Sequence, residues 1–181
     1  MTQKKHLLII SDLWGFQNSD WLQAYLEQLS PYFEISIFDC YLHSEISPSL
    51  TSETEIHSYF IKKGMGICSE KLTKIITKQP CILAFSIGGT IAWKTVLKNN
   101  QFKTFFAVSA TRLRLENKRP TGNISLFYGA EDNSRPTEAW FEQNNIPYTL
   151  FKEKKHNFYM KQDSSTSICS SLINENKLLI I

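Results

Sequence analysis

The sequence contains no apolar run that approaches the ~18–20 residues needed to cross a bilayer. Its formal net charge is only +3, which is too small to indicate a nucleic-acid or membrane-surface protein. Glycine and proline are scarce, with 7 and 6 residues, and no repeat or low-complexity tract occurs, which argues against disorder or collagen-like structure. These absences leave a small folded domain that is expected to bind neither nucleic acid nor membrane.

Cysteine is also sparse, and its spacing carries no metal signature. Cys40, Cys68, Cys81 and Cys169 form no CxxC or CxxH pair, whereas a structural zinc site needs ligands in close pairs. The apolar stretch Leu7–Ile10 is too short for a signal peptide, and no small-residue cleavage site follows it. We therefore expect a reducing cytoplasmic location, free and mostly buried thiols, and no metal.

Short apolar runs are what the sequence does have. A length of 181 residues fits one domain, which we predict over residues 1–181. The runs are mostly continuous rather than alternating, which is typical of strands buried on both faces of a parallel sheet. They are Leu7–Ile10, Ile35–Phe38, Cys81–Phe85, Thr104–Val108, Ile124–Tyr128 and Tyr148–Phe151.

Segments with helical character lie between these runs. They cover residues 21–29, 67–76, 88–97, 136–143 and 164–173. Strands that alternate with helices predict an α/β fold with a mostly parallel sheet of about six strands and helices on both faces. Residues 43–57 are polar and predict a long surface loop. Residues 111–123 predict a second irregular stretch, which carries Arg112, Arg114, Lys118 and Arg119.

A serine between small residues follows the third predicted strand. The segment Ala84-Phe85-Ser86-Ile87-Gly88-Gly89 has the strand–turn–helix pattern of a nucleophile elbow. In such an elbow the serine adopts a strained backbone conformation, and small residues two positions away let the strand and helix approach. The common pattern has glycine where Ala84 stands. A glycine-rich turn after a buried strand is the alternative interpretation.

Two further side chains follow later strands. Asp132 follows the fifth predicted strand and His156 the sixth, so the order is nucleophile, acid, histidine, as in α/β-hydrolases. A serine hydroxyl needs a histidine to accept its proton, and the histidine needs a carboxylate to fix its tautomer. Taken singly, Asp132 could be a turn carboxylate and His156 a surface histidine, and Glu131 is an alternative acid. Because ligands bind at the carboxyl ends of such strands, three candidates at those ends favour a catalytic triad.

An oxyanion hole would complete the site. In this arrangement one backbone N–H comes from the loop after the first strand, and the other from the residue after the nucleophile, here Ile87. The loop reads Ser11-Asp12-Leu13-Trp14-Gly15-Phe16. Trp14 is the candidate for the first donor, with Gly15 letting the chain turn, although Trp14 can also be only a packing residue.

On these motifs the chain resembles a small member of the α/β-hydrolase superfamily. The segment Trp14-Gly15-Phe16-Gln17-Asn18-Ser19-Asp20-Trp21 is similar to the oxyanion loop of pimeloyl-acyl-carrier-protein methyl ester esterases. Those enzymes place Trp-Gly after His-Gly and a further Trp on the following helix, whereas this chain has Asp12-Leu13 in place of His-Gly. Residues 111–123 stand where the family has a helical lid. The resemblance implies hydrolysis without metal or organic cofactor, and the short chain predicts an open, shallow site.

The basic stretch bears on possible partners. In the resembling esterases, basic residues around the lid contact the acidic carrier protein or its phosphopantetheine arm, so Arg112, Arg114 and Arg119 are candidate contacts to substrate or an acyl carrier protein. A solvated basic loop is the alternative.

Three functional hypotheses follow. The first is a serine hydrolase that cleaves a small-molecule carboxylic ester or thioester through an acyl-enzyme on Ser86. The second is an esterase for carrier-linked acyl esters of the biotin-precursor type. The third is a hydrolase-fold binding protein without hydrolytic activity, because a fold does not determine a function.

Overall fold

The structure of the chain is a computed structural model that describes residues 4–17, 19–76 and 78–178. Six parallel strands form one sheet in the order β2-β1-β3-β4-β5-β6. The strands are β1 (Lys5–Ile10), β2 (Phe33–Phe38), β3 (Cys81–Phe85), β4 (Thr104–Val108), β5 (Asn123–Gly129) and β6 (Tyr148–Phe151). Each contains the run that predicted it, so the expected α/β fold with a six-stranded parallel sheet is confirmed.

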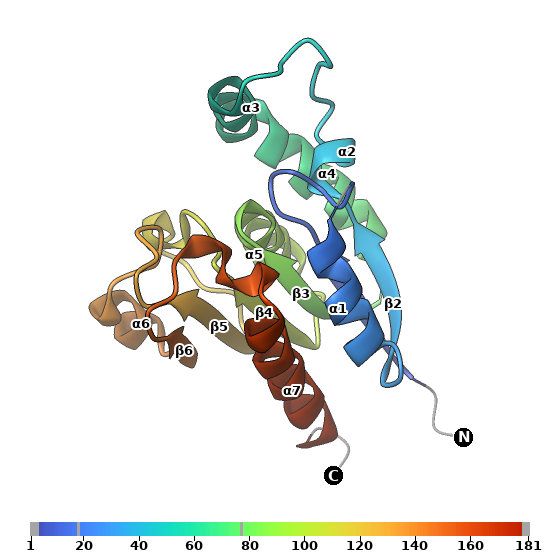
Figure 1. Cartoon of the computed structure of the whole chain (residues 1–181), viewed down its shortest axis with the longest axis vertical. Helices are drawn as coiled ribbons and strands as arrows, with labels where there is room; N and C mark the ends of the chain where they lie inside the picture. Colours follow the sequence, from blue (N-terminus) through green and yellow to red (C-terminus); the bar gives the residue numbers. More distant parts are fainter. Residues whose placement is uncertain (1–3, 18, 77, 179–181) are drawn as a thin grey trace.

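Helices cover both faces of the sheet (Figure 1). On one face lie α1 (Asp20–Leu29) and α7 (Gln162–Leu178), which pack against each other. On the other face lie α4 (Met65–Ile75), α5 (Ile87–Asn99) and α6 (Glu138–Asn144). Within the described part of the chain, none of the helices has the length and apolar character that a membrane span requires.

The sheet divides the hydrophobic core in two. Leu7 and Ile9 of β1 pack in the cluster formed with α1 and α7, whereas Leu8 and Ile10 pack in the cluster on the side of α4, α5 and α6. Successive side chains of a strand point to opposite faces, so a strand covered on both sides needs apolar residues at every position. This is why the fully buried strands β3 and β4 are almost entirely apolar in the sequence.

The connection between β2 and β3 differs from the prediction. Residues 43–57 are not one long loop: the short α2 (Cys40–His43) leads into a loop and then into α3 (Glu53–Tyr59). The π-helical turn η1 (Phe60–Gly64) continues α3 into α4. Figure 1 shows α3 projecting past the end of the sheet at which the strands terminate. The β2–β3 connection, rather than residues 111–123, therefore extends furthest beyond the carboxyl ends of the strands (Figure 1).

A capping box begins α3. The Ser52 hydroxyl accepts the Glu55 N–H, and the Glu55 carboxylate accepts the Ser52 N–H. These reciprocal bonds satisfy two N–H groups that a helix start otherwise leaves unpaired. Ser52 and Glu55 stand three residues apart in the sequence, so this signal was present, although the polar composition of the segment favoured a loop.

Candidate active site

Ser86 lies at the sharp turn from β3 into α5. Its backbone angles, φ 49° and ψ −124°, fall where residues other than glycine are rare, and such a conformation costs about 1–3 kcal/mol. Hydrogen bonds hold the turn: the Ser86 N–H donates to the Val108 carbonyl at 2.9 Å, and the Ser86 carbonyl accepts the Gly89 N–H at 3.0 Å. This geometry is that of a nucleophile elbow.

The two glycines after Ser86 are required by close packing. A Cβ atom on Gly88 would overlap the carbonyl oxygen of Ser11, and one on Gly89 would overlap the side chain of Ala110. The start of α5 therefore packs directly on the loop after β1 and on the segment after β4. As a result, the loop that carries the predicted oxyanion donor lies beside the nucleophile elbow.

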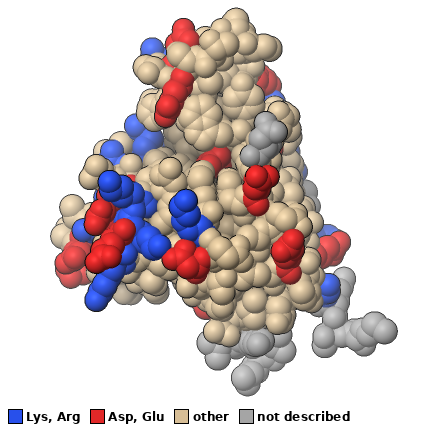
Figure 2. Space-filling model, viewed as in Figure 1, with Lys and Arg blue, Asp and Glu red and all other residues tan. Residues whose placement is uncertain are grey.

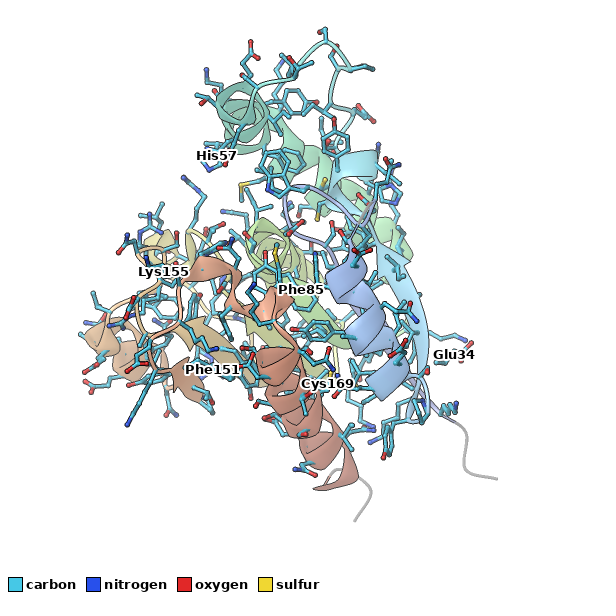
Figure 3. The ribbon with its side chains drawn as sticks, in the orientation of Figure 1. Glu34, His57, Phe85, Phe151, Lys155 and Cys169 are labelled. Carbon is cyan, nitrogen blue, oxygen red and sulfur yellow. The ribbon has the colours of Figure 1, made fainter. Side chains whose placement is uncertain are left out.

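Aromatic residues support the elbow from the α1 side. Phe85, which precedes Ser86, lies near the middle of the molecule (Figure 3). Its ring contacts those of Trp21, Tyr25 and Tyr159, with centroids 4.9, 5.0 and 5.2 Å away. Trp21, the last residue of the segment 14–21 that resembles an oxyanion loop, is therefore part of this packing. Asn18 of the same segment lies outside the described residues.

His156 connects Ser86 to Asp132. Its Nε2 atom is 2.9 Å from Ser86 Oγ, and its Nδ1 atom is 2.9 Å from Asp132 Oδ2. His156 begins the 3-10 turn η3 (His156–Met160), and Asp132 lies in the turn after β5. Asp132 is 3% exposed and the His156 side chain 32% exposed, whereas Glu131 is exposed. The structure thus brings together the predicted serine, acid and histidine, with Asp132 in the position of the acid.

The surroundings of Asp132 favour its charged form. Burial raises the pKa of this carboxyl, but the hydrogen bond and charge of His156 and the N–H of Ser134 lower it more, and the pKa lies below its ordinary value. An ionised Asp132 accepts a proton-bearing Nδ1, which leaves Nε2 of His156 free to accept the Ser86 proton. The Ser109 hydroxyl donates to the His156 carbonyl at 2.7 Å and so holds the start of η3.

The loop after β1 differs from the expectation for Trp14. The Trp14 N–H donates to Oδ1 of Asp12 at 3.0 Å, so an internal carboxylate already occupies the predicted oxyanion donor. The Leu13 N–H makes no hydrogen bond within the described residues and is therefore a second candidate donor from this loop, while the role of Trp14 stays a prediction. Ile87 is the first residue of α5, so its N–H has no acceptor within the helix. The difference arises because an aspartate can accept the N–H two residues ahead.

Arg119 lies away from the site. Its guanidinium donates to four main-chain carbonyls at 2.7–3.2 Å, those of Pro120, Gly122, Asn144 and Asn145. These bonds join the end of α6 to the start of β5. They lie at the amino-terminal ends of the strands, whereas Ser86 follows the carboxyl end of β3. Arg119 is thus a structural tie rather than part of the surface around the nucleophile.

Arg112 and Arg114 remain on the side of the site. The N–H of Thr111 donates to the Ser86 carbonyl at 3.3 Å, so Arg112 follows a residue that contacts the elbow. Arg112 has φ 69° and begins the 3-10 turn η2 (Leu113–Leu115), and Arg114 is exposed and donates to the Ser134 carbonyl at 3.1 Å. Arg112 thus adjoins a residue that contacts the elbow, and Arg114 contacts the turn that carries Asp132.

Replacing Arg119 tests this separation. We expect Arg119→Ala to lower the free energy of unfolding by roughly 1–2 kcal/mol, because several main-chain carbonyls lose their charged donor. The kcat/KM of the folded protein should stay unchanged. Urea denaturation and an ester-hydrolysis assay measure the two quantities, and Arg114→Ala, which removes one exposed bond, is the matched control for the stability measurement. Loss of activity without loss of stability would contradict the structural role.

The charged surface near His156 is mixed. In Figure 2, Lys and Arg side chains gather on the side of the molecule that carries α6 and β6, and Asp and Glu side chains lie among them. Lys155, next to His156, lies on this side (Figure 3). In the same view His57 is on the side of α3 that faces the rest of the molecule. The visible surface beside His156 thus presents both signs of charge rather than a continuous basic patch.

The sequence also made predictions about metal ligands and about the four cysteines. No group of three or more His, Cys, Asp or Glu side chains that could hold a metal ion occurs among the described residues. All four cysteines are buried free thiols, as the sequence predicted. Burial raises the pKa of the Cys169 thiol to about 12, which keeps it in the unreactive protonated form.

Comparison with known proteins adds to this geometry. No protein-family profile matches the chain, and no curated protein matches its sequence. A protein assigned to the α/β-hydrolase superfamily from Xanthomonas campestris pv. campestris superposes with a TM-score of 0.68 at 13% identity, over 95% of this chain and 99% of its own. The chain has the α/β-hydrolase fold.

Two other α/β-hydrolase structures are similar over nearly the whole chain. Alpha/beta hydrolase domain-containing protein 10 from mouse has a TM-score of 0.66 and 13% identity, over 98% of this chain and 92% of its own. An α/β serine hydrolase without a lid from Xanthomonas campestris has a TM-score of 0.63 and 11% identity, over 96% and 84%. These likenesses establish the α/β-hydrolase fold. The finer resemblance of residues 14–21 to pimeloyl-acyl-carrier-protein methyl ester esterases stays a prediction.

Proposed function

We propose that this chain is a serine hydrolase that cleaves a carboxylic ester or thioester through an acyl-enzyme on Ser86. The observation that carries the proposal is the pair of 2.9 Å contacts that join Ser86 Oγ to His156 and His156 to Asp132. They occur at a nucleophile elbow, where the backbone is held in a costly conformation. The solved hydrolases with the same fold give further support.

The proposed acylation step uses the hydrogen bonds that join Ser86, His156 and Asp132. Ser86 Oγ attacks the carbonyl carbon while Nε2 of His156 accepts the hydroxyl proton. Asp132 keeps the proton on Nδ1 and stabilises the imidazolium that forms. The tetrahedral oxyanion accepts hydrogen bonds from the N–H groups of Ile87 and Leu13, and loss of one such donor costs about 2.7–4 kcal/mol of barrier in other holes. His156 then donates its proton to the leaving alcohol or thiol.

Deacylation repeats these roles with water. His156 accepts a proton from a water molecule that attacks the acyl-enzyme, and the oxyanion again forms beside the start of α5. Ser86 then takes the proton back and the carboxylic acid leaves. No step requires a metal or organic cofactor, so we propose that the enzyme uses none.

The substrate proposal favours a small ester. With Arg119 committed to main-chain carbonyls, an acyl carrier protein would meet only Arg112 and Arg114 of the three predicted contacts. Carrier-linked hydrolysis remains the second candidate, supported by the place of Arg112 beside the elbow. It predicts that neutralising Arg112 and Arg114 lowers kcat/KM for carrier-bound esters far more than for free short-chain esters.

The pH dependence of ester hydrolysis tests the proposed base. We expect kcat/KM for a p-nitrophenyl ester to be lower at pH 5 than at pH 8, because a protonated His156 cannot accept the Ser86 proton. Asp132 does not produce this rise, since its lowered pKa keeps it ionised throughout this range. Initial rates in buffers of constant ionic strength measure the profile. A rate that stays constant from pH 5 to 9 would exclude a histidine base.

A further inference from the structure

A second buried carboxylate lies beside the active site, and the reaction described above does not use it. Asp12, the residue that replaces histidine in the oxyanion-loop resemblance, is 2% exposed. Its Oδ1 atom accepts the Trp14 N–H at 3.0 Å, and its Oδ2 atom accepts the Tyr159 hydroxyl at 3.0 Å. Each carboxylate oxygen thus binds a different segment of the chain, one in the loop after β1 and one in η3.

The Tyr159 end of this link reaches the segment that carries His156. Tyr159 lies three residues after His156 in η3, and its ring packs edge-on against the imidazole with centroids 6.3 Å apart. The same ring contacts Trp21 and Phe85, and the Tyr159 main-chain carbonyl accepts the hydroxyl of Tyr25 at 2.9 Å. Tyr159 therefore anchors η3 in the core, while the His156 side chain is partly exposed.

The Trp14 end of the link shapes the oxyanion loop. Asp12 closes a turn on Trp14, and the next turn depends on Gly15, whose φ is +75° and where a Cβ atom would overlap the Asp39 carboxylate. Asp39 in turn accepts the Phe16 N–H at 2.6 Å. Since Asp12 fixes the turn that includes Leu13, it controls the direction of the N–H that we assign to the oxyanion hole.

Removing the Asp12 carboxylate from water costs free energy, and its hydrogen bonds have to offset that cost. Burial raises the pKa of Asp12, and the bonds from Tyr159 and Trp14 oppose this effect only in part. Apolar residues often fill such a position at less energetic cost than a charged network. A buried polar group that accepts hydrogen bonds from two functional segments fixes their relative geometry, which apolar packing does not do.

We propose that Asp12 is a positioning residue that joins the oxyanion loop to the His156 segment through its bonds to Trp14 and Tyr159. The inference rests on the proposed function. Asp12 does not touch the reacting atoms. It keeps the oxyanion donor and the histidine in register, so that both face the carbonyl bound at Ser86. A misplacement of about 1 Å in such an arrangement can cost 10²-fold in rate.

Three variants test the link. Asp12→Ala removes both bonds, and we expect kcat to fall about 10–100-fold with KM changed less than about threefold. Asp12→Asn keeps an acceptor for Trp14 and a polar partner for Tyr159, and should stay within about threefold of wild type. Tyr159→Phe keeps the packed ring and removes only one bond, and should lower kcat about 3–10-fold. The double variant Asp12→Ala/Tyr159→Phe should be no slower than Asp12→Ala, because both changes remove the same link.

The control and the readouts separate positioning from simple stabilisation. Glu175→Gln alters a half-buried carboxylate that accepts the Ser125 hydroxyl at 3.0 Å, and should leave kcat unchanged. Titration with a fluorophosphonate counts competent serines, so kcat is expressed per folded site. An unchanged kcat in Tyr159→Phe would overturn the inference even if Asp12→Ala fails to fold. Equal losses in Asp12→Asn and Asp12→Ala would also overturn it, because the bonds would then not be what matters.

The same assays distinguish failure of the positioning role of Asp12 from failure of the proposed function. If wild type hydrolyses esters and Ser86→Ala does not, while Asp12→Ala keeps full kcat, the positioning role fails and the proposed function stands. If the folded wild-type chain neither hydrolyses esters nor reacts with a fluorophosphonate, the proposed function fails and the positioning role fails with it.

Discussion

Replacing Ser86 with alanine is expected to lower kcat for a p-nitrophenyl ester by about 10⁴–10⁶-fold, to the residual rate supplied by binding and the oxyanion hole. The hydroxyl is the proposed nucleophile, and no other atom of the triad can form the acyl-enzyme. KM should change little, since Ser86 Oγ contributes reactivity rather than substrate affinity. A series of acyl chain lengths, measured on wild type and on Ser86→Ala, would also reveal which ester the site prefers.

Covalent labelling gives the same prediction a second readout. A fluorophosphonate should modify wild type at Ser86, located by peptide mass spectrometry, and should leave Ser86→Ala unlabelled. Ser69→Ala is the matched control: Ser69 is buried, and its hydroxyl is 3.0 Å from that of Thr95 between α4 and α5, away from the elbow. Ser69→Ala should label and hydrolyse like wild type. A folded wild-type chain that does not label would favour the non-hydrolytic binding protein instead.

The fold could be predicted because its signal is local and redundant. Most of the six strands contain continuous apolar runs, and residues such as Phe85 and Val108 are buried because helices cover both faces of the sheet. The order of the strands in the sheet, with β1 between β2 and β3, is not encoded in any single run. It follows from the crossovers, which a pattern of alternating strands and helices constrains only in general terms.

The triad residues could be proposed because parallel strands end at a common edge. Ser86, Asp132 and His156 each follow a strand, and topology alone brings such positions together. The choice between Asp132 and Glu131 could not be made from the sequence, because adjacent residues in a turn point in different directions. The structure buries Asp132 against His156 and leaves Glu131 exposed.

What the sequence could not provide is the partner of each polar group. The Trp14 N–H donates to the Asp12 carboxylate, and the Arg119 guanidinium donates to carbonyls before the start of β5 and at the end of α6. Both bonds depend on side-chain directions that residue spacing does not specify. The link from Asp12 to Tyr159 spans 147 residues of sequence. Only the assembled fold brings these two residues together, and no local pattern announces such a contact.

The acid of the triad is the second position with a large expected effect. Asp132→Asn should lower kcat by about 10⁴-fold, because an asparagine cannot hold the proton on Nδ1 of His156 and cannot stabilise the imidazolium. In the folded chain the His156 ring then favours the tautomer whose Nε2 carries a proton, and this nitrogen can no longer accept the proton of Ser86. Glu131→Gln is the matched control, since it neutralises the adjacent carboxylate, and its kcat should stay within about twofold of wild type.

Stability measurements add an independent check on Asp132. The pKa of Asp132 is lower in the folded chain than its ordinary value of about 3.9, so its ionised form contributes stability above that pH, and this contribution is lost as the pH falls through the folded-state pKa. Asp132→Asn should therefore be less stable than wild type at pH 7, and the difference in unfolding free energy should narrow below about pH 4. If Glu131→Gln lost activity and Asp132→Asn kept it, Glu131 would be the acid, and the 2.9 Å contact between Asp132 and His156 would not be the one that serves the reaction.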